Sequence, residues 1–150
     1  MAREVVGSRR RDERGSAVVE FVTLAVLLLI PLVYLVLLLG RVQAGAYAVS
    51  QASREAGRAY VTADTGEDAA ARARAAARIA FLDQHFEDVG TVSLACDGTP
   101  CLRPDGRVET TATVRVPLPL VPAFVRDAVP MSVPVSASHI STVDRFRGFP

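Results

Sequence analysis

The sequence predicts an α+β protein, in which an N-terminal transmembrane helix continues into an exterior helix and is followed by a second helix and a small antiparallel sheet. Three observations support this fold: one long uncharged apolar run, two alanine-rich segments with helical spacing, and three later runs that alternate apolar and polar residues. The chain has 150 residues and a formal net charge of +1. One anchored domain is therefore expected, and the balanced charge argues against nucleic acid as a partner.

The apolar run extends from Phe21 to Gly40 and contains no charged residue. At about 1.5 Å per residue, a helix of this length spans about 30 Å, the thickness of the hydrocarbon layer of a membrane. A core helix of a soluble protein would keep a polar stripe. We therefore predict a transmembrane helix in contact with membrane lipid over residues 16–40. Pro31, which cannot donate a backbone hydrogen bond, is expected to kink it near Ile30.

Arginine is concentrated on one side of this segment, and Arg41 is the only basic residue that closely follows it. The positive-inside rule then places the N-terminus in the cytoplasm of a single-pass protein of the cell membrane. Residues 1–15 form a cytoplasmic basic leader, residues 41–143 an exterior domain, and residues 144–150 a flexible tail. The basic residues of the leader are Arg3, Arg9, Arg10, Arg11 and Arg14.

Glu20 stands immediately before the apolar run, next to Phe21. Ionisable groups at membrane depth are costly and are therefore candidates for a function. A carboxylate this close to the interface is also able to extend into the headgroup layer. Residue chemistry alone leaves both interpretations of Glu20 open.

The letters RGSAVVEF, from Arg14 to Phe21, precede the apolar run. This pattern resembles the class III signal of type IV pilins and pseudopilins. The resemblance implies that a prepilin peptidase cleaves between Gly15 and Ser16 on the cytoplasmic side and leaves the helix in place. Glycine suits such a site, because a residue without a Cβ lets extended backbone enter a narrow protease cleft.

Residues 15–60 as a whole resemble the TadE-like domain, whose members share the glycine, a Val-Glu-Phe core, a proline in mid-membrane, a Gly-Arg exit and an alanine-rich helix. The resemblance implies a pilin-like fold and a minor pseudopilin that acts in assembly of a tight adherence pilus or a related secretion apparatus. Its implied partners are other pilins or pseudopilins and the inner-membrane assembly platform, within an oligomeric assembly. Ser16 departs from the pattern, since many type IV pilins carry an N-methylated phenylalanine there.

The same resemblance implies a role for Glu20, with Phe21 beside it, in subunit register. Cleavage would expose an α-amino group on Ser16, and a neighbouring subunit would offer this cation to the Glu20 carboxylate. In a poorly screened setting such a pair is strong enough to fix the axial position of one subunit against the next.

The helix is expected to continue beyond Gly40, because small and apolar residues recur at spacings of four and three. This face either contacts another subunit or covers the protein's own sheet, and we favour the second interpretation. Its members are Val42, Ala46, Val49, Ser53, Ala56 and Tyr60.

A second helix is predicted to begin after an N-cap at Asp64 or Thr65 and to run to about Glu87, with Gly90 ending it. Its arginines alternate with acidic residues, which favours a solvated mixed-charge face over a patch for anionic lipid. These arginines are Arg72, Arg74 and Arg78.

Three later runs predict half-buried strands. Val92, Leu94 and Cys96 share one face of the first. In the second, residues 107–116, the inward face carries valines and an alanine. The third, residues 131–137, contains Pro134 and is therefore expected at a sheet edge.

Prolines 117, 119 and 122 predict an extended crossing between the last two strands, followed by one helical turn over residues 123–128.

Cys96 and Cys101 are the only cysteines, and a disulfide across a tight turn is expected outside the membrane. A zinc site would need two more ligands, and only His85 and His139 exist. The sequence has no Gly-rich phosphate loop, metal-ligand cluster or nucleophile–base pair. We therefore expect no enzyme activity, metal or cofactor. Two alternatives are an uncleaved single-pass surface-anchored binding module and an exported hydrolase without recognisable motifs.

Overall fold

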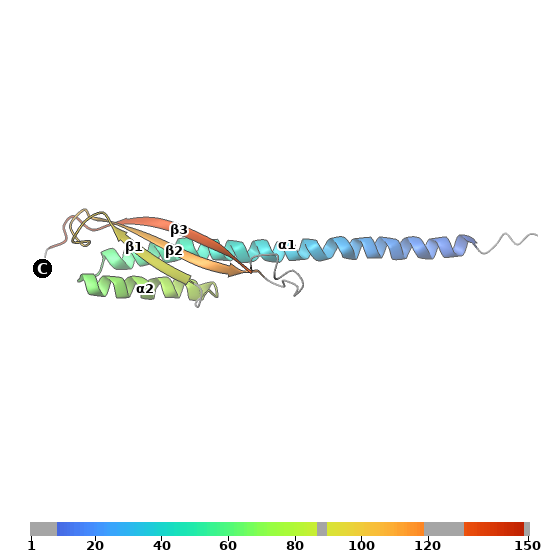
Figure 1. Cartoon of the computed structure of the whole chain (residues 1–150), viewed down its shortest axis with the longest axis horizontal. Helices are drawn as coiled ribbons and strands as arrows, with labels where there is room; N and C mark the ends of the chain where they lie inside the picture. Colours follow the sequence, from blue (N-terminus) through green and yellow to red (C-terminus); the bar gives the residue numbers. More distant parts are fainter. Residues whose placement is uncertain (1–8, 87–89, 119–130, 149–150) are drawn as a thin grey trace, which may run out of the picture. The chain divides into compact units, whose positions relative to one another are not determined.

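The computed structural model describes residues 9–86, 90–118 and 131–148 and has the predicted α+β fold (Figure 1). Two helices precede an antiparallel three-stranded sheet of order β1-β2-β3. The chain divides into two compact units, Met1–Leu37 and Leu38–Pro150. The elements are α1 (Arg9–Val61), α2 (Gly66–Asp83), β1 (Gly90–Cys96), β2 (Arg107–Pro117) and β3 (Ser132–Thr142).

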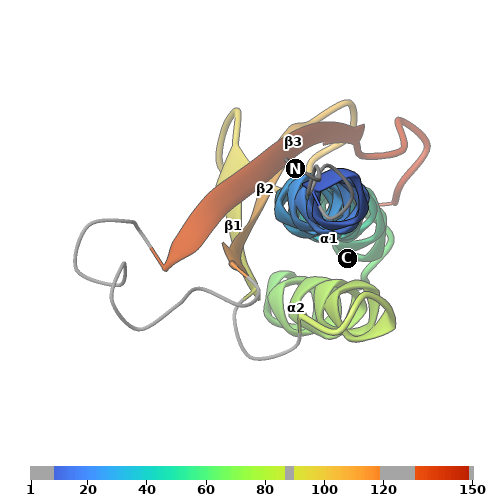
Figure 2. The same cartoon turned by 90° about the vertical axis from the view of Figure 1, so that its right-hand side faces the viewer.

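Within the second unit, α2 and the C-terminal part of α1 lie on the same face of the sheet (Figure 2). The central strand β2 turns every second residue toward them, and all five of these side chains are buried. Because a helix of 3.6 residues per turn meets a flat sheet along one stripe, only a narrow face of each helix is needed to close this core. The inward residues of β2 are Val108, Thr110, Ala112, Val114 and Val116.

The buried face of α1 consists mainly of small side chains, which let the helix approach the sheet closely. Four of the six residues predicted for this face are buried, and Val42 is half-buried. The face covers the protein's own sheet, as we favoured. Ala46 was wrongly included: it is exposed, because the contact stripe passes through Gly45 and Ala48 instead. The buried residues of the stripe are Gly45, Ala48, Val49, Ala52, Ser53, Ala56, Gly57 and Tyr60.

The start of α2 is as predicted, with Thr65 as N-cap accepting a hydrogen bond from the Asp68 backbone N–H. Its end is not, because the helix stops at Asp83. His85 has a positive φ of 59°, its N–H donates to the Leu82 carbonyl, and the Phe86 N–H donates to the Phe81 carbonyl. This is a Schellman motif, and the phenylalanines at both ends of its longer hydrogen bond are buried.

Gly90 therefore does not end α2 but begins β1. A Cβ at this position would overlap the ring of Phe81, so glycine is needed for the strand to pass close to the helix. The inward face of β1 was predicted correctly, since Val92, Leu94 and Cys96 are each less exposed than their neighbours.

Pro134 lies on an edge strand, as predicted, since β3 pairs with β2 on one side of the sheet. The strand is longer than expected: residues 138–142 also pair with residues 107–111 of β2. Pro117, expected in the crossing, is the last residue of β2 and pairs with Ser132. The other two prolines of the crossing and the helical turn over 123–128 lie outside the described residues.

The close approach of α1 to β2 predicts that Gly45 tolerates no side chain. A Cβ there would lie 2.5 Å from Cγ2 of Val116 and 3.8 Å from the ring of Phe86. Overpacking of this kind costs about 1–3 kcal/mol, which outweighs the gain of up to about 1 kcal/mol in helix propensity. Gly45→Ala should therefore lower the unfolding temperature of the full chain in detergent micelles.

Gly40→Ala is the matched control, since Gly40 lies on the same helix and a methyl group there would have no atom within 4 Å. It should leave the unfolding temperature unchanged or raise it. Equal effects of the two substitutions would contradict the packing described for α1.

Candidate functional site

The apolar part of α1 exposes its large side chains on every side. Phe21, Leu27 and Ile30 are between 65% and 72% exposed, and Val26, Val33 and Leu35 are 48% or 49% exposed. Among the described residues, this is the one helix that is long and apolar enough to cross a membrane. Exposure of so much apolar area to water is unfavourable by about 25 cal/mol per Å². The segment is thus consistent with a single-pass membrane protein.

The residues of the predicted signal lie on this helix. The Gly15–Ser16 peptide bond is inside α1, so a protease that binds extended backbone would have to unwind the helix locally. Ser16 and Glu20 are four residues apart and therefore share one helix face. Both Glu20 and Phe21 are exposed, and none of the described side chains forms an ion pair with Glu20.

Pro31 lies in the middle of the apolar segment, and α1 continues through it as one helix. Its ring nitrogen cannot donate to the carbonyl four residues earlier. The hydroxyl of Thr23, by contrast, donates back to the Val19 carbonyl at 2.7 Å and adds no unsatisfied donor to the apolar surface. The kink near Ile30 stays a prediction.

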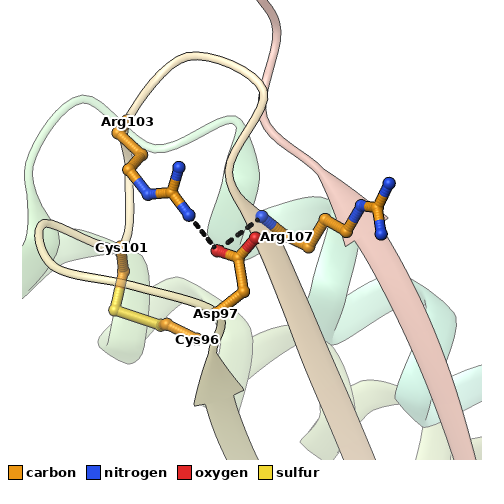
Figure 3. The surroundings of a disulfide bond; sticks show 5 residues. All are labelled: Cys96, Asp97, Cys101, Arg103 and Arg107. Carbon is orange, nitrogen blue, oxygen red and sulfur yellow. Dashed lines mark hydrogen bonds and ion pairs between the residues drawn. A yellow bond between two sulfur atoms is a disulfide. The ribbon is translucent and has the colours of Figure 1, made fainter.

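The disulfide predicted for Cys96 and Cys101 is present, with an S–S distance of 2.10 Å (Figure 3). It closes the start of the turn between β1 and β2. Asp97 then holds the other side of the turn: its Oδ1 accepts from Nη2 of Arg103 at 2.8 Å and from the backbone N–H of Arg107 at 3.0 Å. For so short a loop the chain-entropy contribution of the disulfide is about 2 kcal/mol. The bridge and the carboxylate together fix the shape of this turn.

Part of the tail expected to be flexible is held in place by Arg147. Its Nη1 donates to the carbonyl of Val61 at 3.1 Å, and its Nη2 donates to the carbonyls of Ala63 and Asp64, the latter at 2.8 Å. These carbonyls lie at the end of α1 and just beyond it, where no later helical turn is available to satisfy them. A single guanidinium therefore caps α1 from the opposite end of the chain. The remaining residues 149 and 150 of the predicted tail lie outside the described part.

An open groove of about 360 Å³ runs between one face of α2 and the edge of β1. Two arginines line it, and its other walls are apolar or uncharged, so it offers no acid–base pair. Within the described ranges, no group of three or more His, Cys, Asp or Glu residues is placed to hold a metal ion. His85 and His139 are both exposed. The groove is lined by Arg74, Ala77, Arg78, Phe81, Gly90, Thr91 and Val92.

Three structural contacts were missed by the sequence patterns: Asp97 with its two donors, Arg147 at the end of α1, and Arg41 against Phe86. An Asp-Gly pair directly after Cys96 signals a turn, but not that the carboxylate caps the far side of it. The partners of Arg147 are 83 to 86 residues away. No local pattern indicates such a pairing.

Comparison of the chain with protein-family models, with curated proteins and with solved structures finds no match.

The role of Arg147 predicts a loss of stability on truncation. Arg147→Ala leaves the carbonyls at the end of α1 without this donor and should destabilise the C-terminal unit by about 1–3 kcal/mol. Arg147→Lys should restore little of the lost stability. A lysine ammonium is a compact point charge, whereas the planar guanidinium has separate N–H donors for the three carbonyls. Thermal unfolding, with hydrogen exchange of the amides in the last turn of α1, measures the effect.

Arg145→Ala is the matched control. Among the residues that the structure describes, Arg145 forms only an exposed ion pair with Asp105, with 3.5 Å between Nε and Oδ1, and such pairs contribute little. If both alanine variants lost the same stability, the capping role of Arg147 would be wrong.

Proposed function

We propose that the chain is a pseudopilin-like, non-enzymatic membrane subunit that is processed after Gly15 and acts in assembly of a tight adherence pilus or a related secretion apparatus. The observation that carries the proposal is the signal RGSAVVEF placed directly before an apolar helical segment. A segment exposed on all sides suits both lipid and the packed helices of an assembly. The basic leader supports a cytoplasmic N-terminus, which puts the disulfide-bonded domain outside the cell membrane.

The proposal assigns one task to each part of the chain. The leader and the Gly15–Ser16 bond present the chain to a prepilin peptidase. The apolar helix holds the chain in the membrane until other pilins or pseudopilins and the assembly platform take it up. The exterior domain, which has its own core and a fixed disulfide turn, is a preformed surface for neighbours. We propose no catalytic role for any residue.

Processing is tested by the N-terminal residue of the membrane-extracted protein, determined by mass spectrometry in cells with and without the prepilin peptidase. The expected result is a chain that begins at Ser16 only when the peptidase is present. Gly15→Leu should abolish this product, because a side chain at the cleavage position obstructs the narrow cleft. Gly7→Leu, a change of the same size within the leader, should not.

Two other results would redirect the assignment. A chain that still begins near Met1 in the presence of the peptidase favours an uncleaved surface-anchored binding module. A chain that begins near Gly45 indicates ordinary secretion and removes the retained helix from the proposal.

The proposed register contact gives a second prediction. If the Glu20 carboxylate pairs with the α-amino group of Ser16 on a neighbouring subunit, Glu20→Leu leaves that cation unpaired in a poorly screened environment, at a cost of about 3–5 kcal/mol. Cleavage should continue, while co-purification of two differently tagged subunits should be lost. Glu20→Gln should show the same loss, since it keeps the size of the side chain and removes the charge.

Glu55→Leu serves as the control for this experiment, because Glu55 is an exposed carboxylate on the same helix beyond the apolar segment. It should leave both cleavage and co-purification intact. Normal co-purification of the Glu20→Leu variant would rule out the charge pair and leave Glu20 as a residue that merely reaches the headgroup layer.

A further inference from the structure

Arg41, the first charged residue after the apolar segment, is attached to the exterior domain. Its Nη2 donates to the His85 carbonyl at 3.3 Å, and its guanidinium carbon lies 4.4 Å from the centroid of the Phe86 ring. An arginine beside a membrane segment commonly extends into the headgroups. Here the side chain holds the C-terminal end of α2 instead. The Arg41 side chain therefore connects the end of the apolar run to the residues that directly follow α2.

The sheet reaches the same end of the domain. Val116, near the end of β2, lies against the position of Gly45, only a few residues beyond Arg41 on α1. Two residues further on, the backbone N–H of Leu118 donates to the Met131 carbonyl at 3.1 Å. Leu118 and Met131 are thus at about the level of Arg41 along α1.

Large apolar side chains are exposed at this end of the domain. Ile79 is 61% exposed, Leu82 is 40% exposed and Met131 is 48% exposed, while Leu118 is half-buried. Ile79 and Leu82 are three residues apart and lie on the same side of α2. The opposite end of α2 is polar, with residues 64–68 exposed and two acidic residues in the first turn. On α2, the exposed large apolar side chains therefore lie toward the end that Arg41 contacts.

We infer that this end of the domain, formed by Ile79, Leu82, Leu118 and Met131, rests on the lipid surface around the apolar segment. The inference depends on the membrane anchor of the proposed function, and not on cleavage or filament assembly. The interfacial layer of a bilayer is about 5–7 Å thick on each side of the hydrocarbon. When the hydrocarbon layer ends near Gly40, side chains at the level of Arg41 lie within this interfacial layer.

Lipid fits this patch better than a second protein does, because the patch lies near Arg41, the residue that directly follows the end of the apolar run at Gly40. Burial of its side chains in the interface removes apolar area from water without requiring any matching surface. The attached Arg41 also explains why the patch stays at this level, since the end of α2 cannot move away from the exit of the helix without breaking the contacts with Phe86 and His85.

The experiment uses the full chain in nanodiscs of phosphatidylcholine and phosphatidylglycerol, with one nitroxide label per variant. Because both native cysteines are in the disulfide, an added cysteine is labelled selectively under non-reducing conditions. Leu82→Cys tests the patch, and Met131→Cys tests it independently on the sheet. Ala71→Cys is the matched control, since residue 71 is exposed on the same face of α2 three turns earlier. Val33→Cys reports on the apolar segment itself.

The measured quantity is the accessibility of each label to oxygen relative to a water-soluble nickel chelate. The expected ratio at positions 82 and 131 is several-fold higher than at position 71 and approaches that at position 33. A ratio at both patch positions equal to that at position 71, with position 33 in lipid, overturns the inference and leaves the anchor intact. Labels at 82 and 131 that neither reagent reaches overturn it as well, because they indicate a protein contact. Water exposure at position 33 removes the anchor and the inference together.

Discussion

The close contact between the small-residue face of α1 and the central strand β2 is the interaction on which the C-terminal unit, Leu38–Pro150, depends. Alanine, serine and glycine dominate this face, so each residue contributes little buried area, and the free energy comes from close approach of helix and sheet. Gly45 and Gly57 are the positions where any side chain would meet β2 or β3. The large buried side chains Phe81 and Phe86 lie at the C-terminal end of α2 and just beyond it.

Because the core is made of small residues, the ends of the elements are fastened by polar contacts. The N-cap at Thr65, the Schellman motif at His85, the carboxylate of Asp97 and the guanidinium of Arg147 each satisfy backbone groups that no regular element reaches. Each such hydrogen bond contributes about 0.5–1.5 kcal/mol, so together these contacts add to the stability that the core supplies.

The sequence predicted what repeats along the chain and missed what depends on one distant contact. Helical spacing located α1 and α2, and alternation located the inward faces of β1 and β2, because each element buries a face with its own period. The helical spacing wrongly included Ala46 in the buried stripe of α1. A period of 3.6 residues fits several neighbouring stripes, and only the contact with the sheet determines which of them is buried. The end of α2 was placed too late, because a histidine rather than a glycine adopts the left-handed conformation. β3 was predicted too short, because its last residues are mostly exposed and give no alternation.

All of the basic residues of this chain are arginines, and several of its contacts use properties that lysine lacks. Arg147 donates to three carbonyls. The guanidinium of Arg103 lies next to Gly98 and binds the Asp97 carboxylate. Arg41 lies over the ring of Phe86 and donates to the His85 carbonyl. Each needs a planar cation with several fixed donors, whereas an ammonium group is more strongly hydrated and has no flat face. The C-terminal unit thus combines a core of small side chains with guanidinium contacts at both ends, and Arg41 connects that core to the end of the apolar run at Gly40.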